Sequence, residues 1–274
     1  MGNAKPAVFR LMVAVAVLLA VVRADASGPP PEAMAGWNAY VAAVEERRAA
    51  EVERPEGFLV LDFAGRTAAD RRALMNGEVL VAPMERAGAG RDDLDVRGAM
   101  VHHWRGAVFV PGVTVDALVA ALEASPPPQE DVLRSRVLGR GPETLTVYLR
   151  LRRTRFVTVV YDTEHRVRFD RQGTGRASST SLATRITEID RPGTAEERAI
   201  PRGEDHGFLW RLNAYWRYES VGGGVIAECE SLTLSRTVPF GLGAIAGPII
   251  NSTARESMEA ALRAVAGLGH RAVH

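Results

Sequence analysis

The sequence predicts an α+β fold, in which an antiparallel sheet is completed by one long C-terminal helix. Long stretches of β-branched and aromatic residues follow one another and are joined by short polar turns, which is typical of an antiparallel meander. Helical patterns do not alternate with these strands, so a parallel α/β fold is disfavoured. The last third shows the pattern most clearly, because two strands flank the turn Gly222–Gly224 and an amphipathic stretch follows them.

The N-terminus has the pattern of a secretory signal peptide. Lys5 and Arg10 precede the unbroken apolar run 11–22, and Ala24-Asp25-Ala26 supplies a small-residue cleavage site. The run is shorter than the roughly 20 residues that a membrane-spanning helix needs. We therefore expect cleavage after Ala26 and a periplasmic or secreted protein. An uncleaved N-terminal anchor is the alternative.

The composition is that of an ordinary globular protein, with 46% apolar residues, 24% charged residues and a formal net charge of +1. This near-neutrality argues against a dedicated nucleic-acid-binding protein. Cys229 is the only cysteine, so an internal disulfide is impossible. We interpret Cys229 as a small buried strand residue rather than a nucleophile. The composition gives no indication of the oligomeric state.

A helix is expected from Glu32 to about Arg54, since Trp37, Tyr40 and Val44 recur at helical spacing. The apolar segment 58–63 and a short helix from Thr67 to Leu74 follow, and we interpret this region as an appendage on the main domain. The expected divisions are 1–26 (signal peptide), 27–76 (linker and helical appendage), 77–266 (main domain) and 267–274 (tail).

The main domain is expected to open with strands 78–84 and 99–110. Thr114 is a good N-cap for a helix from Val115 to Ala124, which Pro126–Pro128 end. A run of strands follows, and after it the closing helix. The expected strands are 132–138, 144–151, 156–169, 178–189, 207–219 and 225–236, with a charged loop at 191–205 and the final helix at 249–266.

Two segments resemble the helix-grip fold of the START-like (SRPBCC) superfamily, which includes polyketide cyclases, plant allergen-type lipid carriers and coenzyme Q-binding proteins. The segment Phe109–Ala124 (FVPGVTVDALVAALEA) is similar to the opening of that superfamily, and Leu232–Val265 resembles its last strand and long closing helix. The segment HGFLWRLN–YWR also resembles uncharacterised exported bacterial proteins. The resemblance spans about Gly77–Ala266 and leaves the N-terminal helix unexplained.

The resemblance implies a curved antiparallel sheet wrapped around the C-terminal helix, with a cavity between them. It implies no fixed catalytic residues, because members share architecture more than chemistry. The sequence departs from the pattern at Pro126–Pro128, where a turn is expected in place of the usual second short helix.

Strand alternation assigns side chains to faces. In the strand 207–219 the cavity side is expected to carry Trp210, Leu212, Ala214, Trp216 and Tyr218, and the solvent side Leu209, Arg211, Asn213, Tyr215 and Arg217. His165 and Thr163 are polar groups in an otherwise apolar inward row, as a small-molecule site requires. A satisfied core histidine is the alternative. The expected ligand-binding residues are Val147, Leu149, Val159, Tyr161, His165, Trp210, Leu212, Trp216, Tyr218 and Met258.

No metal site or cofactor is expected. His102 and His103 are adjacent in a strand and point to opposite faces, while His270 and His274 lie on the terminal tail. The segment 241–246 (GLGAIA) matches a dinucleotide-binding pattern, but no second parallel strand follows it. We interpret its glycines as a turn from sheet to helix.

A basic hairpin is expected around Arg150, Arg152, Arg153 and Arg155. Arginine stems lie on apolar surface while the charge stays in water, so contact with anionic lipid headgroups is one interpretation. A solvated outer sheet face is the other.

The leading functional hypothesis is an exported, non-enzymatic carrier or sensor for an apolar or amphipathic small molecule such as a lipid or isoprenoid. One alternative is a cyclase- or hydrolase-type enzyme with His165 as acid/base and Tyr161 as its partner. The other is a structural envelope protein that docks through Trp37 and Tyr40 of the N-terminal helix.

Overall fold

The computed structural model describes residues 28–54, 57–63, 65, 67–84, 96–154, 158–237 and 243–272. The expected signal peptide, Arg155 and His274 lie outside these ranges. Among the described residues, no helix combines the length and apolar character that crossing a bilayer demands.

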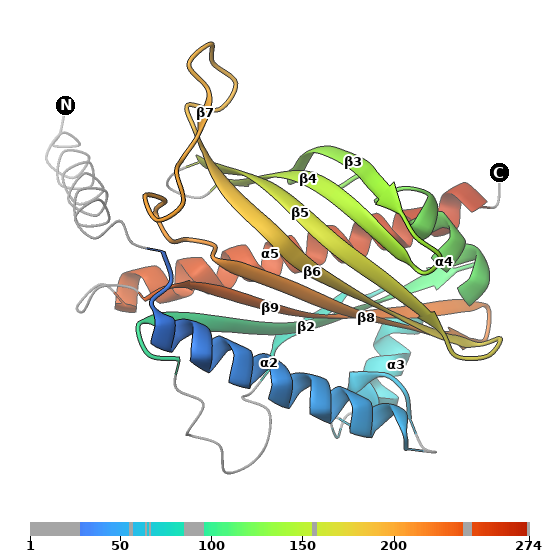
Figure 1. Cartoon of the computed structure of the whole chain (residues 1–274). Helices are drawn as coiled ribbons and strands as arrows, with labels where there is room; N and C mark the ends of the chain where they lie inside the picture. The colour runs from blue at the N-terminus through green and yellow to red at the C-terminus, as the bar shows by residue number, and fades with distance from the viewer. Residues whose placement is uncertain are drawn as a thin grey trace, which may run out of the picture.

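The described residues form a nine-stranded antiparallel sheet, which confirms the α+β helix-grip prediction (Figure 1). Its order is β1-β2-β9-β8-β6-β5-β4-β3, with β7 paired to β6. The expected meander is present from β3 to β6, and β9 returns to pair with β2. The strands are β1 (Leu80–Pro83), β2 (Ala99–Pro111), β3 (Val132–Arg140), β4 (Thr144–Thr154), β5 (Thr158–Arg171), β6 (Arg176–Asp190), β7 (Arg198–Ala199), β8 (Arg211–Val221) and β9 (Gly224–Arg236).

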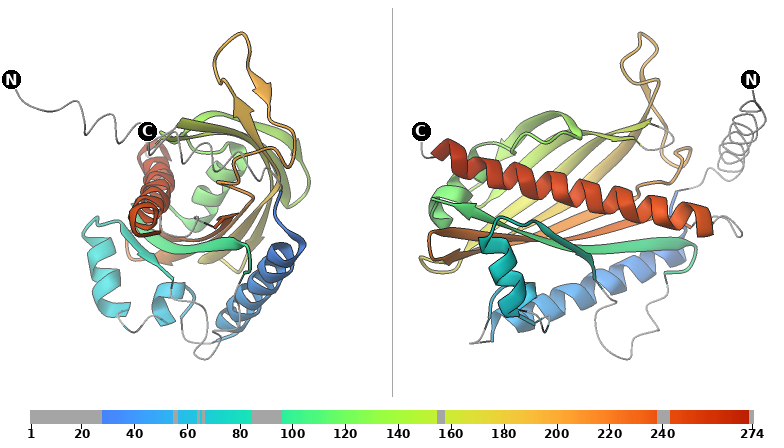
Figure 2. Two further views of the ribbon diagram at one scale, coloured as in Figure 1. Left: turned by 90° about the vertical axis from the view of Figure 1, so that its left-hand side faces the viewer. Right: turned by 180° about the vertical axis from the view of Figure 1, so that it is seen from behind.

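The closing helix α5 (Gly243–Ala272) lies along the concave side of the sheet (Figure 2). It is longer than the expected 249–266. Gly106 in β2 permits its close approach, because a Cβ there would lie 2.6 Å from Leu262 Cδ1 and 2.9 Å from Met258 Cγ. A residue without a side chain is therefore required where β2 meets α5.

Helix α4 (Val115–Ala124) has the expected bounds. The Thr114 hydroxyl accepts a hydrogen bond from the Ala117 amide at 3.2 Å, as expected of its N-cap. Residues 125–131 then lead directly to β3 with no second helix, as the proline run predicts. Val115, Leu118 and Val119 are buried against the concave face of the sheet.

The N-terminal segment covers the opposite, convex face (Figures 1 and 2). It consists of α2 (Pro31–Val52), the short helix η1 (Val60–Phe63) and α3 (Thr67–Met75). Trp37 and Tyr40 of α2 are buried against Leu232 and Leu234 of β9. Docking to another protein through an exposed Trp37 and Tyr40 is therefore contradicted, because both side chains already pack on the sheet.

The convex position of α2 also corrects the faces expected in β8. Asn213, Tyr215 and Arg217 were expected in solvent, but all three are buried beneath the N-terminal segment. The Arg217 guanidinium donates to Glu51 and to the Phe58 carbonyl, each at 2.8 Å. Alternation separated the two faces of β8 correctly, but the face that was expected in solvent is covered by the N-terminal segment.

Candidate functional site

One half of the concave face is a closed core. Tyr218, Met258 and Leu262 are buried there with the apolar side of α4. Val147 and Phe169 complete this half from β4 and β5. Four of these five side chains are less than 5% exposed and Phe169 is 5% exposed, so this end of the sheet is filled by the chain itself.

The other half of the concave face is more open, and we call it the inner patch. Its members lie on the same face, as the cross-strand pairs Leu149↔Thr163, Thr163↔Ile186 and Ser181↔Ala214 show. Most of its apolar side chains are only half-buried. The inner patch comprises Leu149, Val159, Thr163, His165, Ser181, Ala183, Ile186, Leu212, Ala214 and Trp216.

A chain of hydrogen bonds runs across the inner patch. The Thr163 hydroxyl donates to the Leu149 carbonyl at 3.0 Å. His165 Nε2 lies 3.0 Å from the Thr163 hydroxyl, and His165 Nδ1 lies 3.3 Å from the Ser181 hydroxyl. Burial lowers the pKa of His165 to about 4, so the imidazole is neutral at pH 7.

Tyr161 lies two residues before Thr163 on the same face and is buried. Its hydroxyl has no hydrogen-bond partner in the described part of the chain. Burial and the nearby carboxylates of Glu188 and Asp205 raise its pKa well above the usual value, so the hydroxyl keeps its proton. The Tyr161 hydroxyl is therefore an unsatisfied donor.

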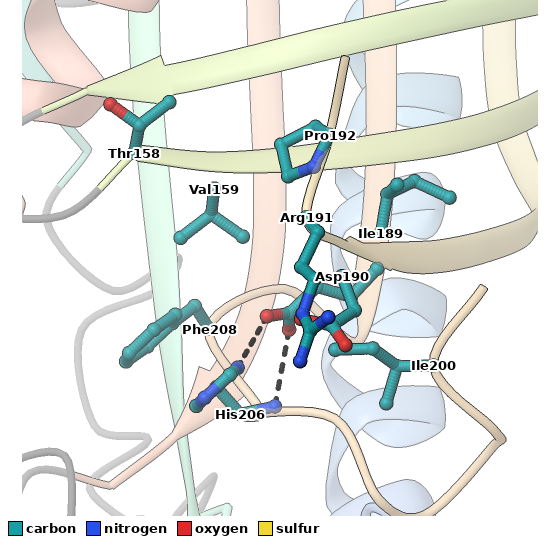
Figure 3. Close-up of a pocket in the computed structure, with 10 residues that line it drawn as sticks. Thr158, Val159, Ile189, Asp190, Arg191, Pro192, Ile200, His206 and Phe208 are labelled. Carbon is teal, nitrogen blue, oxygen red and sulfur yellow. Dashed lines mark hydrogen bonds and ion pairs between the residues drawn. The ribbon is translucent and has the colours of Figure 1, made fainter. Parts of the chain in front are cut away.

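A small pocket lies at the end of β5 and β6, next to the inner patch (Figure 3). Its volume is about 140 Å³, and Val159, Pro192, Ile200 and Phe208 form its apolar walls. The Glu188 carboxylate accepts hydrogen bonds from the amide and the ring Nδ1 of His206 in this pocket. Sites for drug-sized ligands span roughly 300–1,000 Å³, so this pocket alone holds only a small group.

Charged side chains of the concave face lie near the ends of their strands, and each has a partner. Arg153 pairs with Asp131, Arg171 with Glu123, and Glu188 with His206. The inner patch itself has no charged residue. Its polar groups are two hydroxyls, one neutral imidazole and the indole N–H of Trp216.

The basic hairpin is not a row of unpaired cations. Arg150 bonds Asp162 at 2.7 Å and Glu197 at 2.8 Å, and Arg153 bonds Asp131. Arg152 is exposed, while Arg155 is outside the described residues. Contact of this hairpin with a membrane stays a prediction.

The predicted ligand-binding residues separate into three groups. Leu149, Val159, His165, Leu212 and Trp216 lie in the inner patch, with Tyr161 beside it. Val147, Tyr218 and Met258 belong to the closed core. Trp210 is a correction, because it precedes β8 and packs with Trp37 and Leu234 on the convex side.

Sequence reasoning missed Ser181 and Ile186. Both lie on β6, where the pairing with β5 shifts register between Glu164 and His165. The irregularity breaks simple alternation, so no count along β6 places these two residues together on one face. The near repetition of serine and alanine at 177–183 was the available signal.

His102 and His103 point to opposite faces, as predicted. His102 Nε2 lies 3.0 Å from the Ser235 hydroxyl, on the concave side. On the convex side, His103 lies between the Tyr40 hydroxyl at 2.8 Å and Glu230 at 2.7 Å. This buried convex group joins α2 to the sheet, and we interpret it as structural.

No family model matches the chain, and no curated protein matches it in sequence. Solved structures are similar to it. A STAR-related lipid transfer protein from Xanthomonas axonopodis matches 69% of this chain and 98% of its own, with 16% identity and a TM-score of 0.44. The Zhui aromatase/cyclase from Streptomyces sp. R1128 matches 64% and 97%, with 13% identity and a TM-score of 0.42. The human StarD13 lipid transfer and protein localization domain matches 73% and 94%, with 9% identity and a TM-score of 0.40.

Likeness at these identities and TM-scores carries no argument about function. The fold assignment depends instead on the chain's own topology. The sheet is antiparallel, α4 follows its second strand, and the long α5 lies along its concave side. The chain therefore has a helix-grip fold.

Proposed function

We propose that this protein binds an apolar or amphipathic small molecule on the inner patch, as a carrier or sensor. The inner patch carries the proposal, because it leaves apolar side chains half-buried on a concave face, while Asn213, Tyr215 and Arg217 on the convex face of β8 are buried. Leu149, Leu212 and Trp216 supply apolar surface around His165. Apolar walls with a few placed polar groups are characteristic of small-molecule sites.

A carrier or sensor fits His165 better than acid/base catalysis does. Its pKa of about 4 makes the imidazole a weak base at neutral pH. Both ring nitrogens lie within reach of hydroxyls, and no carboxylate in the described residues is hydrogen-bonded to the ring. We therefore assign His165 a role in orienting polar groups of the inner patch.

Filling the inner patch tests the proposal. Ala214 is half-buried in its centre, so Ala214→Trp places an indole where the ligand would lie. Displacement of the neutral fluorescent probe N-phenyl-1-naphthylamine measures the affinity, and native mass spectrometry of protein from its own host identifies a retained ligand. The matched control is Ala120→Trp, at an exposed position of α4.

Ala214→Trp is expected to weaken probe binding by about tenfold or more, because burial of apolar area on the patch is lost. Ala120→Trp is expected to leave it unchanged. The proposal fails if the wild-type protein does not bind the probe, or if both variants bind it equally well.

We also propose that the protein is exported. The apolar run 11–22 and the Ala24-Asp25-Ala26 site support this. Mass measurement of the protein from its own host is expected to find Ser27 as the first residue. A cytoplasmic protein that keeps residues 1–26 would contradict export.

A further inference from the structure

The hydrogen-bond chain of the inner patch has a direction. The Leu149 carbonyl only accepts, so the single Thr163 hydroxyl proton is donated to it. Thr163 must then accept from His165 Nε2, which fixes the proton of the ring on that nitrogen. A neutral imidazole with a protonated Nε2 has a bare Nδ1. Ser181 therefore donates its hydroxyl proton to Nδ1.

Ser181 is the last group in this series of hydrogen bonds, and it has no further proton to donate. Ser181 has a single hydroxyl proton, which His165 uses, and its oxygen keeps lone pairs for a further hydrogen bond. Ser181 is half-buried in the inner patch, so part of this residue is exposed on the concave side. The group that meets the Ser181 oxygen has to be a donor.

The distribution of charge also favours an uncharged ligand group. The inner patch has no charged residue, and the arginines near the strand ends, Arg153 and Arg171, are already paired with carboxylates. An ionised carboxylate placed against Ser181 Oγ would bring lone pairs to a lone pair, and it would lose its hydration without a counter-charge. A neutral hydroxyl meets neither obstacle.

We infer that the inner patch selects an apolar molecule that carries an uncharged hydrogen-bond donor, a hydroxyl group, with Ser181 Oγ as the acceptor. The inference depends on the proposed function and names the chemical class of its ligand. It assigns Ser181 as a specificity-determining residue, positioned through His165 and Thr163.

Three probes with the same alkyl chain test it on the full-length mature protein: decanol, decyl methyl ether and decanoate, each displacing N-phenyl-1-naphthylamine at pH 7. The alcohol and the ether differ in the donor, and decanoate adds charge. Ser181→Ala removes the acceptor. Ser178→Ala is the matched control, because Ser178 lies on the same strand and pairs with Arg217 of the convex side.

The ratio of alcohol to ether affinity is expected to fall about fivefold in Ser181→Ala, which corresponds to one ordinary hydrogen bond, and to be unchanged in Ser178→Ala. Decanoate is expected to bind the wild type about tenfold more weakly than decanol or worse. Comparing this ratio between the wild type and each variant cancels the different water solubilities of the alcohol and the ether.

The outcomes separate the two proposals. An unchanged ratio in Ser181→Ala, or decanoate binding as tightly as decanol, overturns the hydroxyl inference while ligand binding stands. Failure of the wild type to bind any of the probes, including the fluorescent one, overturns both.

Discussion

His103 Nε2 lies 2.7 Å from Oε1 of Glu230, in a contact that joins β2 and β9 beneath α2. The Glu230 side chain is 0% exposed, and Arg48 donates to its other oxygen at 2.9 Å. Burial by itself raises the pKa of Glu230, but hydrogen bonds and charge from His103, Arg47 and Arg48 outweigh it. They hold the pKa well below the usual value. This group fastens the N-terminal segment to the sheet.

Glu230→Ala is expected to lower the free energy of unfolding by about 3–5 kcal/mol, because it removes the buried carboxylate that the partly buried Arg47 and Arg48 share. Urea denaturation at pH 7 measures the change. Glu164→Ala is the control, since Glu164 pairs with the exposed Arg185 and should cost less than about 1 kcal/mol. Equal losses in the two variants would contradict the importance assigned to the buried group.

The same group predicts an acid-dependent loss of stability. The folded pKa of Glu230 is depressed, so its contribution is present above the unfolded value of about 4.3 and is lost as the pH falls below it. The wild type is expected to lose more stability than Glu230→Ala in that acid range. Parallel curves for the two proteins would show that Glu230 is not responsible.

Removing residues 28–54 is expected to destroy cooperative folding rather than to release an independent domain. The truncation exposes Leu232, Leu234 and Tyr215 and strips Glu51 from the buried Arg217. Thermal unfolding followed by circular dichroism tests this. A cooperative transition at the wild-type temperature would mean that the segment is a dispensable appendage.

Gly106→Ala is expected to cost about 1–3 kcal/mol, because the new methyl group collides with Leu262 and Met258 of α5. Gly222→Ala is the control, at an exposed turn where a Cβ meets nothing within 4 Å. The double variant Gly106→Ala/Leu262→Ala should be less destabilised than the sum of the two single variants, since Leu262→Ala makes room. Strict additivity would show that Leu262 is not the obstructing group.

His165 gives a second pH dependence. Its pKa of about 4 in the folded protein lies below the unfolded value of about 6.5. At pH values between about 4 and 6.5 the histidine is therefore protonated in the unfolded chain and neutral in the folded protein. The free energy of unfolding therefore decreases as the pH is lowered through this window. Between pH 6.5 and 5 the wild type should lose about 1.5 kcal/mol more than His165→Gln. Identical pH profiles would contradict the buried, neutral imidazole.

Tyr161→Phe is expected to leave the ligand-free protein unchanged or to stabilise it by up to about 1 kcal/mol. The hydroxyl that it removes is buried and has no partner in the described residues. Urea denaturation of both proteins without added ligand measures the difference. A loss above 1 kcal/mol would reveal a hydrogen bond that stabilises the folded state.

The elements of this fold are largely predictable from the sequence. Thr114, the apolar period of α4 and the prolines after it fix that helix to the residue, since capping and helix termination are local. The start of β8 was misplaced by four residues, at Gly207 in place of Arg211, and Trp210 went to the wrong face as a result. Ser181 escaped notice because a register shift in β6 is set by its neighbour β5.

The sequence by itself determined the local decisions: the strands and turns, the capped helix, and the division of each strand into two faces. Only the tertiary structure decided what covers each face. The strand pattern predicts that Arg217 lies at the surface. In the folded protein it is buried and donates hydrogen bonds to Glu51, 166 positions away, and to the Phe58 carbonyl. Desolvation and long-range ion pairs arise only when distant segments meet. The alternation of polar and apolar residues within one strand therefore cannot predict them. For the same reason, the proton order that leaves Ser181 as an acceptor became visible only after β4, β5 and β6 were placed side by side.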